Sequence, residues 1–443
     1  MQKLTQKNLN EIINKLDSYL NDLIENDEFS GAVLVGSKGE SLYKKAFGLA
    51  HRGFKIPNQV NTKFNLGSMN KMFTGLAIAQ LVEKECLNYD NLVKDILPNY
   101  PNQDIAANVN IHQLLTHTSG MGSHFNQKYM QTSKDRFRTV DDFIPLFVDD
   151  ELSFRPGSKF QYSNAGYLLL GKIIEEVSGK SYYDQIREGI YQPAGMNNTE
   201  CYELDYDTPN LAQGYTRIFP EKNGELRNNI FLHVVKGGPA GGGYSTVEDL
   251  FKFSKALQNG SLLKLDNLET TWSGKVDRKG PHDRYAYGFT ENLAFGTRIM
   301  GHGGGFPGIN SRLDMYPDQE ICVAVMSNYD PRTAEKVTTR LRYMLTETPL
   351  PEFIEFSSED LISLTGVYIL DQSDLKINIL IRDSKLWIQS PEMGSICIMP
   401  ISNKIFIDQE TFENQYIFDI GDLGKVEKLS TAAFGPQMIF KKI

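Results

Sequence analysis

The stretch at residues 64–77, FNLGSMNKMFTGLA, places a serine and a lysine three residues apart at the start of an apolar run. We expect a helix here, in which positions i and i+3 share one face and Lys71 can reach the Ser68 hydroxyl. A helix N-terminus favours negative charge and would help a developing oxyanion, and burial would lower the pKa of the lysine toward that of an effective base. Ser68 and Lys71 are therefore candidates for a nucleophile and its base, although an N-cap serine beside a surface lysine fits the same letters.

The Ser-x-x-Lys pattern is weak by itself, because it occurs four times in this chain, at Ser41, Ser68, Ser261 and Ser373. Ser41 lies in a predicted strand, where residues three apart point to opposite faces. Ser261 follows an Asn-Gly pair in a loop, and Ser373 lies in a charged turn. Only Ser68, preceded by Gly67, begins a long helix, so position rather than pattern selects it.

A serine nucleophile also needs a proton acceptor and an oxyanion hole, and two later segments contain suitable residues. The segment KFQYSNAGYLLLG (159–171) has Tyr162, Ser163 and Asn164 in a loop before an apolar helix. The segment MGHGGGFPGINS (300–311) has His302 and three glycines at the end of a predicted strand. Glycines let the backbone approach a substrate carbonyl closely. The G-x-S-x-G elbow of triad hydrolases is absent around Ser68, so other helpers are required.

These three segments, Ser68-Met69-Asn70-Lys71, Tyr162-Ser163-Asn164 and His302-Gly303-Gly304, resemble in order the motifs of the serine β-lactamase and penicillin-binding-protein superfamily. The resemblance is strongest to the branch of class C β-lactamases, D-alanyl-D-alanine carboxypeptidases and esterases. Two more stretches, HQLLTHTSGM (112–121) and GGPAGGGYSTVEDLFKF (237–253), are also similar to that branch. The resemblance covers residues about 10–345.

The resemblance implies an acyl-enzyme mechanism with a role for each motif. Ser68 would be the acylated nucleophile, and Lys71 the neighbouring base that takes its proton. Tyr162 would share proton transfer to and from the leaving group. The backbone N–H groups of Ser68 and Gly305 would form the oxyanion hole. No cofactor and no metal ion are implied.

The substrate side of the site departs from the pattern of class C β-lactamases. Asn164 would bind the substrate amide or ester, and His302, Gly303 and Gly304 would contact the substrate. Class C enzymes have Lys-Thr-Gly where this chain has His-Gly-Gly, and a histidine is mostly neutral at pH 7. We therefore expect an esterase, or an enzyme similar to D-aminopeptidases and carboxypeptidases that acts on D-amino-acid or small amide peptides, rather than an efficient β-lactamase. The alternative is a non-catalytic or slowly turning-over penicillin-binding or sensing protein.

The pattern of strands and helices predicts an α/β (α+β) fold. FSGAVLVGSKGESLYKKAFGLAHR (29–52) reads as a hairpin, helical patterns dominate the middle, and strand patterns return after residue 285. We expect a β-lactamase-like central antiparallel sheet, flanked by helices, with an inserted helical region. Residues 1–348 would form this domain, and 349–354, with two prolines, a linker. Short β segments in 355–443 predict a small antiparallel barrel, similar to a lipocalin, or a sandwich. These segments are KINILIRD, KLWIQS, SICIMPI, KIFID and QYIFDI.

Composition limits the partners. The chain has 443 residues, 40% of them hydrophobic, and a net charge of −9, which argues against nucleic acid because phosphate binding needs a basic surface. We expect a small-molecule or short-peptide substrate and leave the oligomeric state open. No apolar stretch is long enough for a transmembrane segment. The polar N-terminal segment lacks the apolar core of a signal peptide, so we expect a cytoplasmic protein, or alternatively a periplasmic or secreted one whose leader has been removed.

Other residues are interpreted as structural. His117, in LLTHTSG, lies in a loop beside hydroxyl residues and is expected to be a hydrogen-bonding histidine without a catalytic role. The remaining histidines lack the spacing of metal ligands. The four cysteines, scattered along the chain, are expected to be buried, reduced thiols, with Cys86 in a helix. The glycines at 241–243 are expected to line the site opposite the nucleophile.

Overall fold

The structure is a computed structural model that describes residues 6–217, 225–370, 375–390, 394–420, 426–431 and 438–443. Ser373, which begins one of the Ser-x-x-Lys matches, lies outside the described residues. Contacts divide the chain into two units. The first comprises Met1–Asp277 and His282–Thr338, and the second comprises Arg278–Pro281 and Thr339–Ile443.

An eight-stranded sheet is formed by the described residues, and its order along the sheet is β2-β1-β14-β13-β12-β11-β10-β9. The strands are β1 (Gly31–Ser37), β2 (Glu40–Phe47), β9 (Val276–Gly280), β10 (Asp283–Tyr285), β11 (Thr290–Ala294), β12 (Thr297–Phe306), β13 (Ile309–Tyr316) and β14 (Ile321–Ser327). β1 pairs antiparallel with β14, so that Gly31 lies opposite Ser327. Segments from the two ends of the predicted domain therefore share one sheet, as the sequence predicts. All residues of β1, β13 and β14 are buried, as expected for strands covered on both faces.

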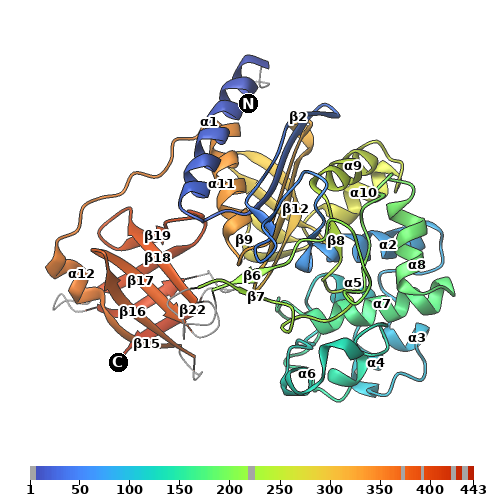
Figure 1. Cartoon of the computed structure of the whole chain (residues 1–443). Coiled ribbons are helices and arrows are strands. Elements are labelled where there is room, and N and C mark those ends of the chain that lie inside the picture. Colours follow the sequence, from blue (N-terminus) through green and yellow to red (C-terminus); the bar gives the residue numbers. More distant parts are fainter. Residues whose placement is uncertain (1–5, 218–224, 371–374, 391–393, 421–425, 432–437) are drawn as a thin grey trace. The chain divides into compact units, whose positions relative to one another are not determined.

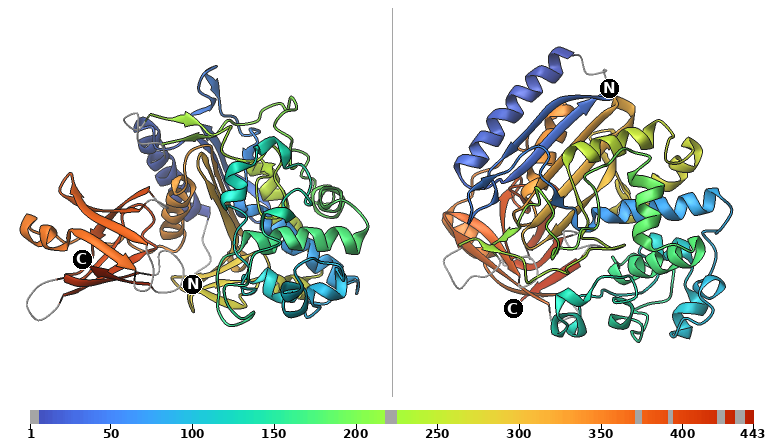
Figure 2. Two further views of the ribbon diagram at one scale, coloured as in Figure 1. Left: turned by 90° about the horizontal axis from the view of Figure 1, so that it is seen from below. Right: turned by 45° about the vertical axis from the view of Figure 1, so that its right-hand side comes forward.

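Helices cover both faces of this sheet. Figures 1 and 2 show α1 (Gln6–Glu25) and α11 (Thr333–Leu345) against one face and the helices of the inserted region against the other. On the first face, Tyr43 Oη in β2 donates a hydrogen bond to Asp17 of α1 at 2.8 Å. On the other face, Gly36 in β1 makes room for Phe251 of α9 (Val247–Gln258), since a Cβ at Gly36 would lie 2.3 Å from that ring.

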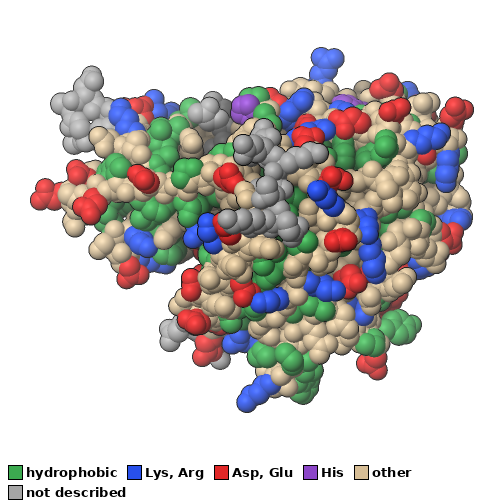
Figure 3. Space-filling model, turned by 90° about the horizontal axis from the view of Figure 1, so that it is seen from above, with side chains coloured by type: hydrophobic (Ala, Val, Ile, Leu, Met, Phe, Trp, Pro, Cys, Tyr) green, Lys and Arg blue, Asp and Glu red, His purple; other side chains and the backbone are tan. Residues whose placement is uncertain are grey.

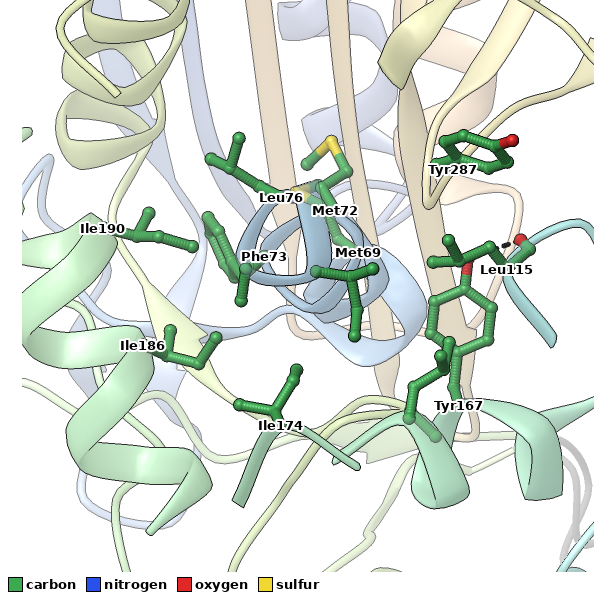
Figure 4. Close-up of a cluster of buried hydrophobic side chains, with 14 of the residues drawn as sticks. Met69, Met72, Phe73, Leu76, Leu115, Tyr167, Ile174, Ile186, Ile190 and Tyr287 are labelled. Carbon is green, nitrogen blue, oxygen red and sulfur yellow. Dashed lines mark hydrogen bonds between the residues drawn. The ribbon is translucent and has the colours of Figure 1, made fainter. Parts of the chain in front are cut away.

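The central helix of the inserted region is α2 (Lys71–Glu83). Its residues are buried from Lys71 through Leu81, which fits a sequence that is apolar on all sides of the helix. Figure 4 shows apolar side chains around it, labelled Met69, Met72, Phe73, Leu76, Leu115, Tyr167, Ile174, Ile186, Ile190 and Tyr287. α2 ends before Cys86, which is exposed. The prediction of a buried Cys86 in a helix was therefore wrong, whereas the other three cysteines are buried.

The first unit contains further helices and three small ladders. Its other described helices are α3 (Val93–Ile96), α4 (Gln103–Asn108), α5 (Ile111–Leu115), α6 (Gln127–Gln131), α7 (Asn164–Ser178), α8 (Tyr182–Ile186), α9 (Val247–Gln258) and α10 (Leu265–Trp272). Three two-stranded ladders join β3 (Leu49–His51) with β4 (Ile56–Pro57), β5 (Phe64–Asn65) with β8 (Tyr244–Ser245), and β6 (Tyr215–Thr216) with β7 (Arg227–Asn228). The β5–β8 ladder leads directly into the segment that carries Ser68.

The second unit contains a closed antiparallel barrel, preceded by α12 (Ser358–Leu364). Its described strands are β15 (Gly366–Leu370), β16 (Lys376–Arg382), β17 (Lys385–Ser390), β18 (Gly394–Pro400), β19 (Ile405–Asp408), β20 (Gln415–Ile420), β21 (Val426–Thr431) and β22 (Met438–Lys442). Side chains alternate along β16, where Ile377 and Ile379 are buried, and Tyr368, Phe406 and Phe418 help to fill the interior. The predicted fold class is confirmed, and the barrel is the correct one of the two architectures expected for this region.

The surface fits the composition. On the face drawn in Figure 3, Lys and Arg side chains lie interspersed with Asp and Glu side chains of the described residues. Within the part of the chain that the structure describes, no helix combines the length and the apolar character needed to span a bilayer.

Candidate active site

The sequence predicts Ser68 at the start of the α-helix. In the structure Ser68 lies instead in a 3₁₀ turn, η1 (Gly67–Asn70), just before that helix. The turn leads directly into α2. Gly67 has a φ of +50°, in the left-handed region that favours glycine, and its N–H donates to Asn65 Oδ1 at 2.8 Å. This bend after β5 leaves the half-buried Ser68 at the edge of a pocket.

Lys71 is the first residue of α2, and its side chain is completely buried. Its Nζ lies 3.2 Å from Ser68 Oγ, 2.8 Å from Asn164 Oδ1 and 2.5 Å from the carbonyl oxygen of Ala240. Burial lowers the pKa of Lys71 well below its ordinary value, because an ammonium loses its hydration there. A neutral amine has two N–H groups and one lone pair. The N–H groups can donate to Asn164 and Ala240, which leaves the lone pair for the proton of Ser68.

Asn164 is held by the N-terminus of α7. Ser163 is the N-cap of this helix, and its Oγ accepts a hydrogen bond from the N–H of Gly166 at 2.9 Å. The same hydroxyl donates to the carbonyl oxygen of Gly122 at 2.8 Å, and Asn164 Nδ2 donates to Ser123 Oγ at 3.4 Å. The start of α7 and the segment at 122–123 therefore position the amide oxygen that Lys71 contacts.

Tyr162 lies beside Lys71 and is supported by His117. The ring centroid of Tyr162, a side chain that is 38% exposed, lies 4.8 Å from Lys71 Nζ. The buried ring of His117 lies 4.2 Å from the Tyr162 ring, and its Nδ1 accepts a hydrogen bond from the N–H of Ser163 at 3.0 Å. An acceptor nitrogen carries no proton, so His117 is neutral with its proton on Nε2.

The predicted hydrogen-bonding role of His117 is confirmed, but sequence reasoning missed its contact with Tyr162. His117 has a φ of +58°, which is uncommon for a residue other than glycine. The only signal in the sequence was its place in the stretch LLTHTSG. The residue supports both the ring of Tyr162 and the backbone that leads to Asn164.

His302 lies in β12 with both ring nitrogens next to groups of the protein itself. Its Nε2 lies 2.9 Å from Tyr285 Oη, and its Nδ1 lies 2.5 Å from the carbonyl oxygen of Gly303. The side chain is buried, and it is not among the described residues that line the pocket beside Ser68. The Tyr285 ring in turn lies 4.4 Å from the His117 ring. The structure thus places His302 in an aromatic cluster behind Tyr162, and a direct contact with substrate stays a prediction.

The glycines of β12 bring this strand against the turn that carries Ser68. A Cβ at Gly304 would lie 1.9 Å from the carbonyl oxygen of Leu66, so only glycine permits this approach. The Cβ position built on Gly67 lies 3.0 Å from the backbone nitrogen of Gly305. Ser311 Oγ in β13 donates to the carbonyl oxygen of Leu66 at 2.6 Å and fixes the same contact. The backbone N–H groups of Ser68 and Gly305 are therefore brought to neighbouring positions.

A pocket opens beside Ser68. It is lined by Asn65, Gly67, Ser68, His124, Phe125, Tyr129, Phe143, Asn164, Leu168, His233, Val234, Gly238, Ala240, Gly241, Gly242, Gly305, Phe306 and Ile309. Gly241 and Gly242 contribute to the wall near Ser68, and Gly242 N–H donates to the carbonyl oxygen of Gly67 at 3.2 Å. Sequence reasoning did not identify the aromatic residues of this wall.

The other described Ser-x-x-Lys matches lack such surroundings. Lys44, the partner of Ser41 in the pattern, pairs instead with Glu248 at 3.2 Å. Ser261 Oγ donates to Asn259 Oδ1 at 2.6 Å. Among the described residues, no group of three His, Cys, Asp or Glu side chains is arranged to hold a metal ion.

Comparison with known proteins identifies a family for the region that contains this site. Residues 16–347 match the family model described as Beta-lactamase. Penicillin-binding protein 4* of Bacillus subtilis (strain 168) is 32% identical over 331 residues, which cover 72% of each chain.

Solved structures of other proteins are also similar to this chain. A penicillin binding protein from Bacillus halodurans superposes with a TM-score of 0.67 and 30% identity, covering 74% of this chain and 98% of that one. An octameric penicillin-binding protein homologue from Pyrococcus abyssi superposes with a TM-score of 0.69 and 25% identity, covering 96% of this chain and 99% of that one.

Proposed function

Because the chain belongs to the Beta-lactamase family, we propose that it is a serine hydrolase that forms an acyl-enzyme on Ser68. Its substrates are esters, or D-amino-acid and small amide peptides. The observation that carries the proposal is the position of Lys71 Nζ, buried 3.2 Å from Ser68 Oγ, with two other acceptors to occupy its N–H groups.

In the acylation step, Ser68 Oγ attacks the substrate carbonyl carbon while its proton passes to Lys71 Nζ. The carbonyl oxygen becomes an oxyanion, and the N–H groups of Ser68 and Gly305 stabilise it by donating hydrogen bonds. When the tetrahedral intermediate collapses, the bond to the leaving oxygen or nitrogen breaks. That atom takes a proton through Tyr162, whose ring lies 4.8 Å from Lys71 Nζ, and Tyr162 is reprotonated from Lys71.

Deacylation repeats these steps with water as the nucleophile. Water attacks the acyl carbon and loses a proton through Tyr162 to Lys71, which is neutral again after acylation. The bond between the acyl carbon and Ser68 Oγ then breaks, and the serine oxygen takes this proton back from Lys71, which becomes neutral again. The carboxylic acid leaves, and the enzyme returns to its starting state without any cofactor.

The preference for esters and small amides over β-lactams rests on the third motif. His302 stands where class C enzymes have a lysine, and its nitrogens lie next to Tyr285 and Gly303. A fixed positive charge for a substrate carboxylate is therefore missing at this position. We assign the chemistry to residues 1–348 and propose residues 349–354 as the linker to a barrel domain at 355–443, because α11 is one continuous helix that ends at Leu345.

The test compares two serines of the same pattern. Ser68→Ala should lower the hydrolysis of p-nitrophenyl butyrate by at least about 10³-fold, whereas Ser261→Ala, which removes a loop hydroxyl, should keep the parent rate. Equal rates for Ser68→Ala and the parent would refute the assignment.

A second candidate function follows from the name of the similar Bacillus subtilis protein: a penicillin-binding or sensing protein that acylates without turning over. Intact-mass spectrometry after incubation with benzylpenicillin separates the two. A permanent adduct on Ser68, together with no steady-state turnover of esters or D-amino-acid amides, would favour the sensor. Turnover that depends on Ser68 favours the hydrolase.

A further inference from the structure

We propose that the pocket beside Ser68 binds the acyl part of the substrate and selects an uncharged aromatic or bulky apolar group. This inference rests on the proposed function, because it concerns the group that becomes attached to Ser68. It goes further by naming the chemical class of that group and the side chains that select it.

Aromatic side chains from two distant segments form the wall of the pocket. The Phe125 and Phe306 rings stack with centroids 5.5 Å apart and an interplanar angle of 25°. Phe125 also meets Tyr129 edge to face at 5.1 Å, and His124 meets Phe143 in the same way at 5.7 Å. Such rings offer large apolar surfaces and favour stacked or edge-to-face contact with another ring.

The lining is also without charge. None of the described residues that line the pocket is Lys, Arg, Asp or Glu. Burial lowers the pKa of His124 to about 3, with a smaller contribution from the charge of Lys71, and burial also lowers the pKa of His233. Both lining histidines are therefore neutral at pH 7.

Lys71 and Lys134 contact lining residues, and both are engaged elsewhere. Lys71 faces Ser68 and Asn164. Lys134 lies over the Tyr129 ring, and its Nζ donates to the carbonyl oxygens of Tyr129 and Thr132. A carboxylate buried in this pocket would have no counter-charge, which is energetically unfavourable.

The position of the pocket assigns it to the acyl group and not to the leaving group. Ser68, Gly305 and Asn164 line it, so an occupant lies next to the reacting carbon. Tyr162, the proposed proton donor to the leaving group, is not among its described lining residues; its ring packs instead on His117. A leaving group directed toward Tyr162 therefore points away from this pocket.

Phe125 is the residue to change, because 42% of its surface is exposed and its truncation should disturb the fold little. We expect Phe125→Ala to lower the ratio of kcat/KM for p-nitrophenyl phenylacetate to that for p-nitrophenyl acetate by about 10-fold. The matched control is Phe54→Ala, which removes another exposed ring that stacks on a histidine, His51, at 4.4 Å outside the pocket. It should leave the ratio unchanged.

A change of charge provides the converse measurement. Phe125→Lys should raise kcat/KM for the p-nitrophenyl ester of 4-carboxyphenylacetic acid relative to the uncharged phenylacetate ester, by about 10-fold or more. A series of acetate esters with different alcohols should show no comparable change in either variant. Unchanged ratios in both variants, or a response confined to the alcohol series, would overturn the assignment of the pocket.

Labelling with a fluorophosphonate makes the two failures distinguishable. If Ser68→Ala loses both the label and ester hydrolysis while the ratios stay constant in the Phe125 variants, only the acyl-pocket inference is wrong. If Ser68→Ala retains hydrolysis, the proposed function itself is wrong.

Discussion

The carbonyl oxygen of Ala240 lies 2.5 Å from Lys71 Nζ. Ala240 belongs to the glycine-rich segment at 237–243, whose backbone lies beside the turn that carries Ser68. The hydrogen bond takes one N–H of the buried amine, as Asn164 takes another. The proton-accepting lone pair is thereby directed toward Ser68 by two groups from distant parts of the chain.

Replacing the Lys71 amine should lower the activity and raise the stability of the folded protein. We expect Lys71→Met to lower kcat/KM for p-nitrophenyl butyrate by about 10²- to 10⁴-fold, the usual loss when a general base is removed. The same variant should be more stable at pH 7, because an apolar side chain of similar length replaces a buried amine with a strongly shifted pKa. Thermal or urea unfolding of both proteins measures this. A variant with lowered stability and full activity would contradict both statements.

The pH dependence of unfolding follows from the same group. Burial lowers the pKa of Lys71 in the folded state, while in the unfolded chain it is about 10.4. Between these values the unfolded state binds more protons, so the free energy of unfolding rises with pH, by up to about 1.4 kcal/mol per pH unit from this group. Lys71→Met should lack that contribution. Urea unfolding at pH 7 and pH 9 should therefore show a smaller increase for the variant than for the parent.

Activity should also increase with pH. Only the neutral amine can accept the proton of Ser68, so kcat/KM should fall as the pH drops through the lowered pKa of Lys71. Steady-state rates on an ester that is stable across the range give the profile. A rate that rose on acidification would be incompatible with Lys71 as the base.

Two adjacent glycines offer a paired test of the oxyanion region. Gly304→Ala should reduce activity by about 10²-fold or more, since its Cβ would collide with the carbonyl oxygen of Leu66 at 1.9 Å and move β12 away from Ser68. Gly303→Ala should be tolerated, because its Cβ meets Arg312 and Ser311 at 3.5 Å, an ordinary contact distance. Hydrolysis rates and melting temperatures of both variants provide the comparison. Equal effects of the two substitutions would contradict this prediction, because they would show that β12 can shift to accept a Cβ at Gly304.

His117 should act as a positioning residue. We expect His117→Phe to lower kcat by about 10-fold with a smaller change in KM, because it keeps a ring against Tyr162 but loses the acceptor for the Ser163 N–H. His117→Asn keeps a side chain that tolerates positive φ and can accept a hydrogen bond, but it loses the ring. A pH profile displaced in His117→Asn would indicate altered support of Tyr162. If both variants had the melting temperature and the kcat/KM of the parent, His117 would not be a positioning residue.

The strand and helix patterns predicted much of this architecture, because they are local. The hairpin around SKGE and the apolar helix after Ser68 both follow from neighbouring letters. In the barrel, the sequence analysis singled out β16 to β20 but not β15, β21 or β22. Closure depends on β15 pairing with β22, which is a contact between distant segments, and β21, VEKLST, has too few apolar residues to mark it as a strand.

The residues to which we assign the proposed chemistry could be selected from the sequence where they lie at the start or end of an element. Ser68, Asn164 and Gly305 each occupy such a place. The pocket could not be predicted, because Phe125 and Phe306 meet only after the sheet and the inserted region have come together. The supporting position of His117 also depends on tertiary packing, and no local pattern carries it.

The pairing of β1 with β14 has a consequence during biosynthesis. Gly31 finds its partner, Ser327, only after almost the entire first unit has been translated, which takes on the order of tens of seconds at usual elongation rates. Until then the apolar strand GAVLVGS has only the β2 hairpin beside it. We therefore expect nascent chains that stop before β14 to bind chaperones or aggregate, and the native sheet to close late, near the completion of synthesis.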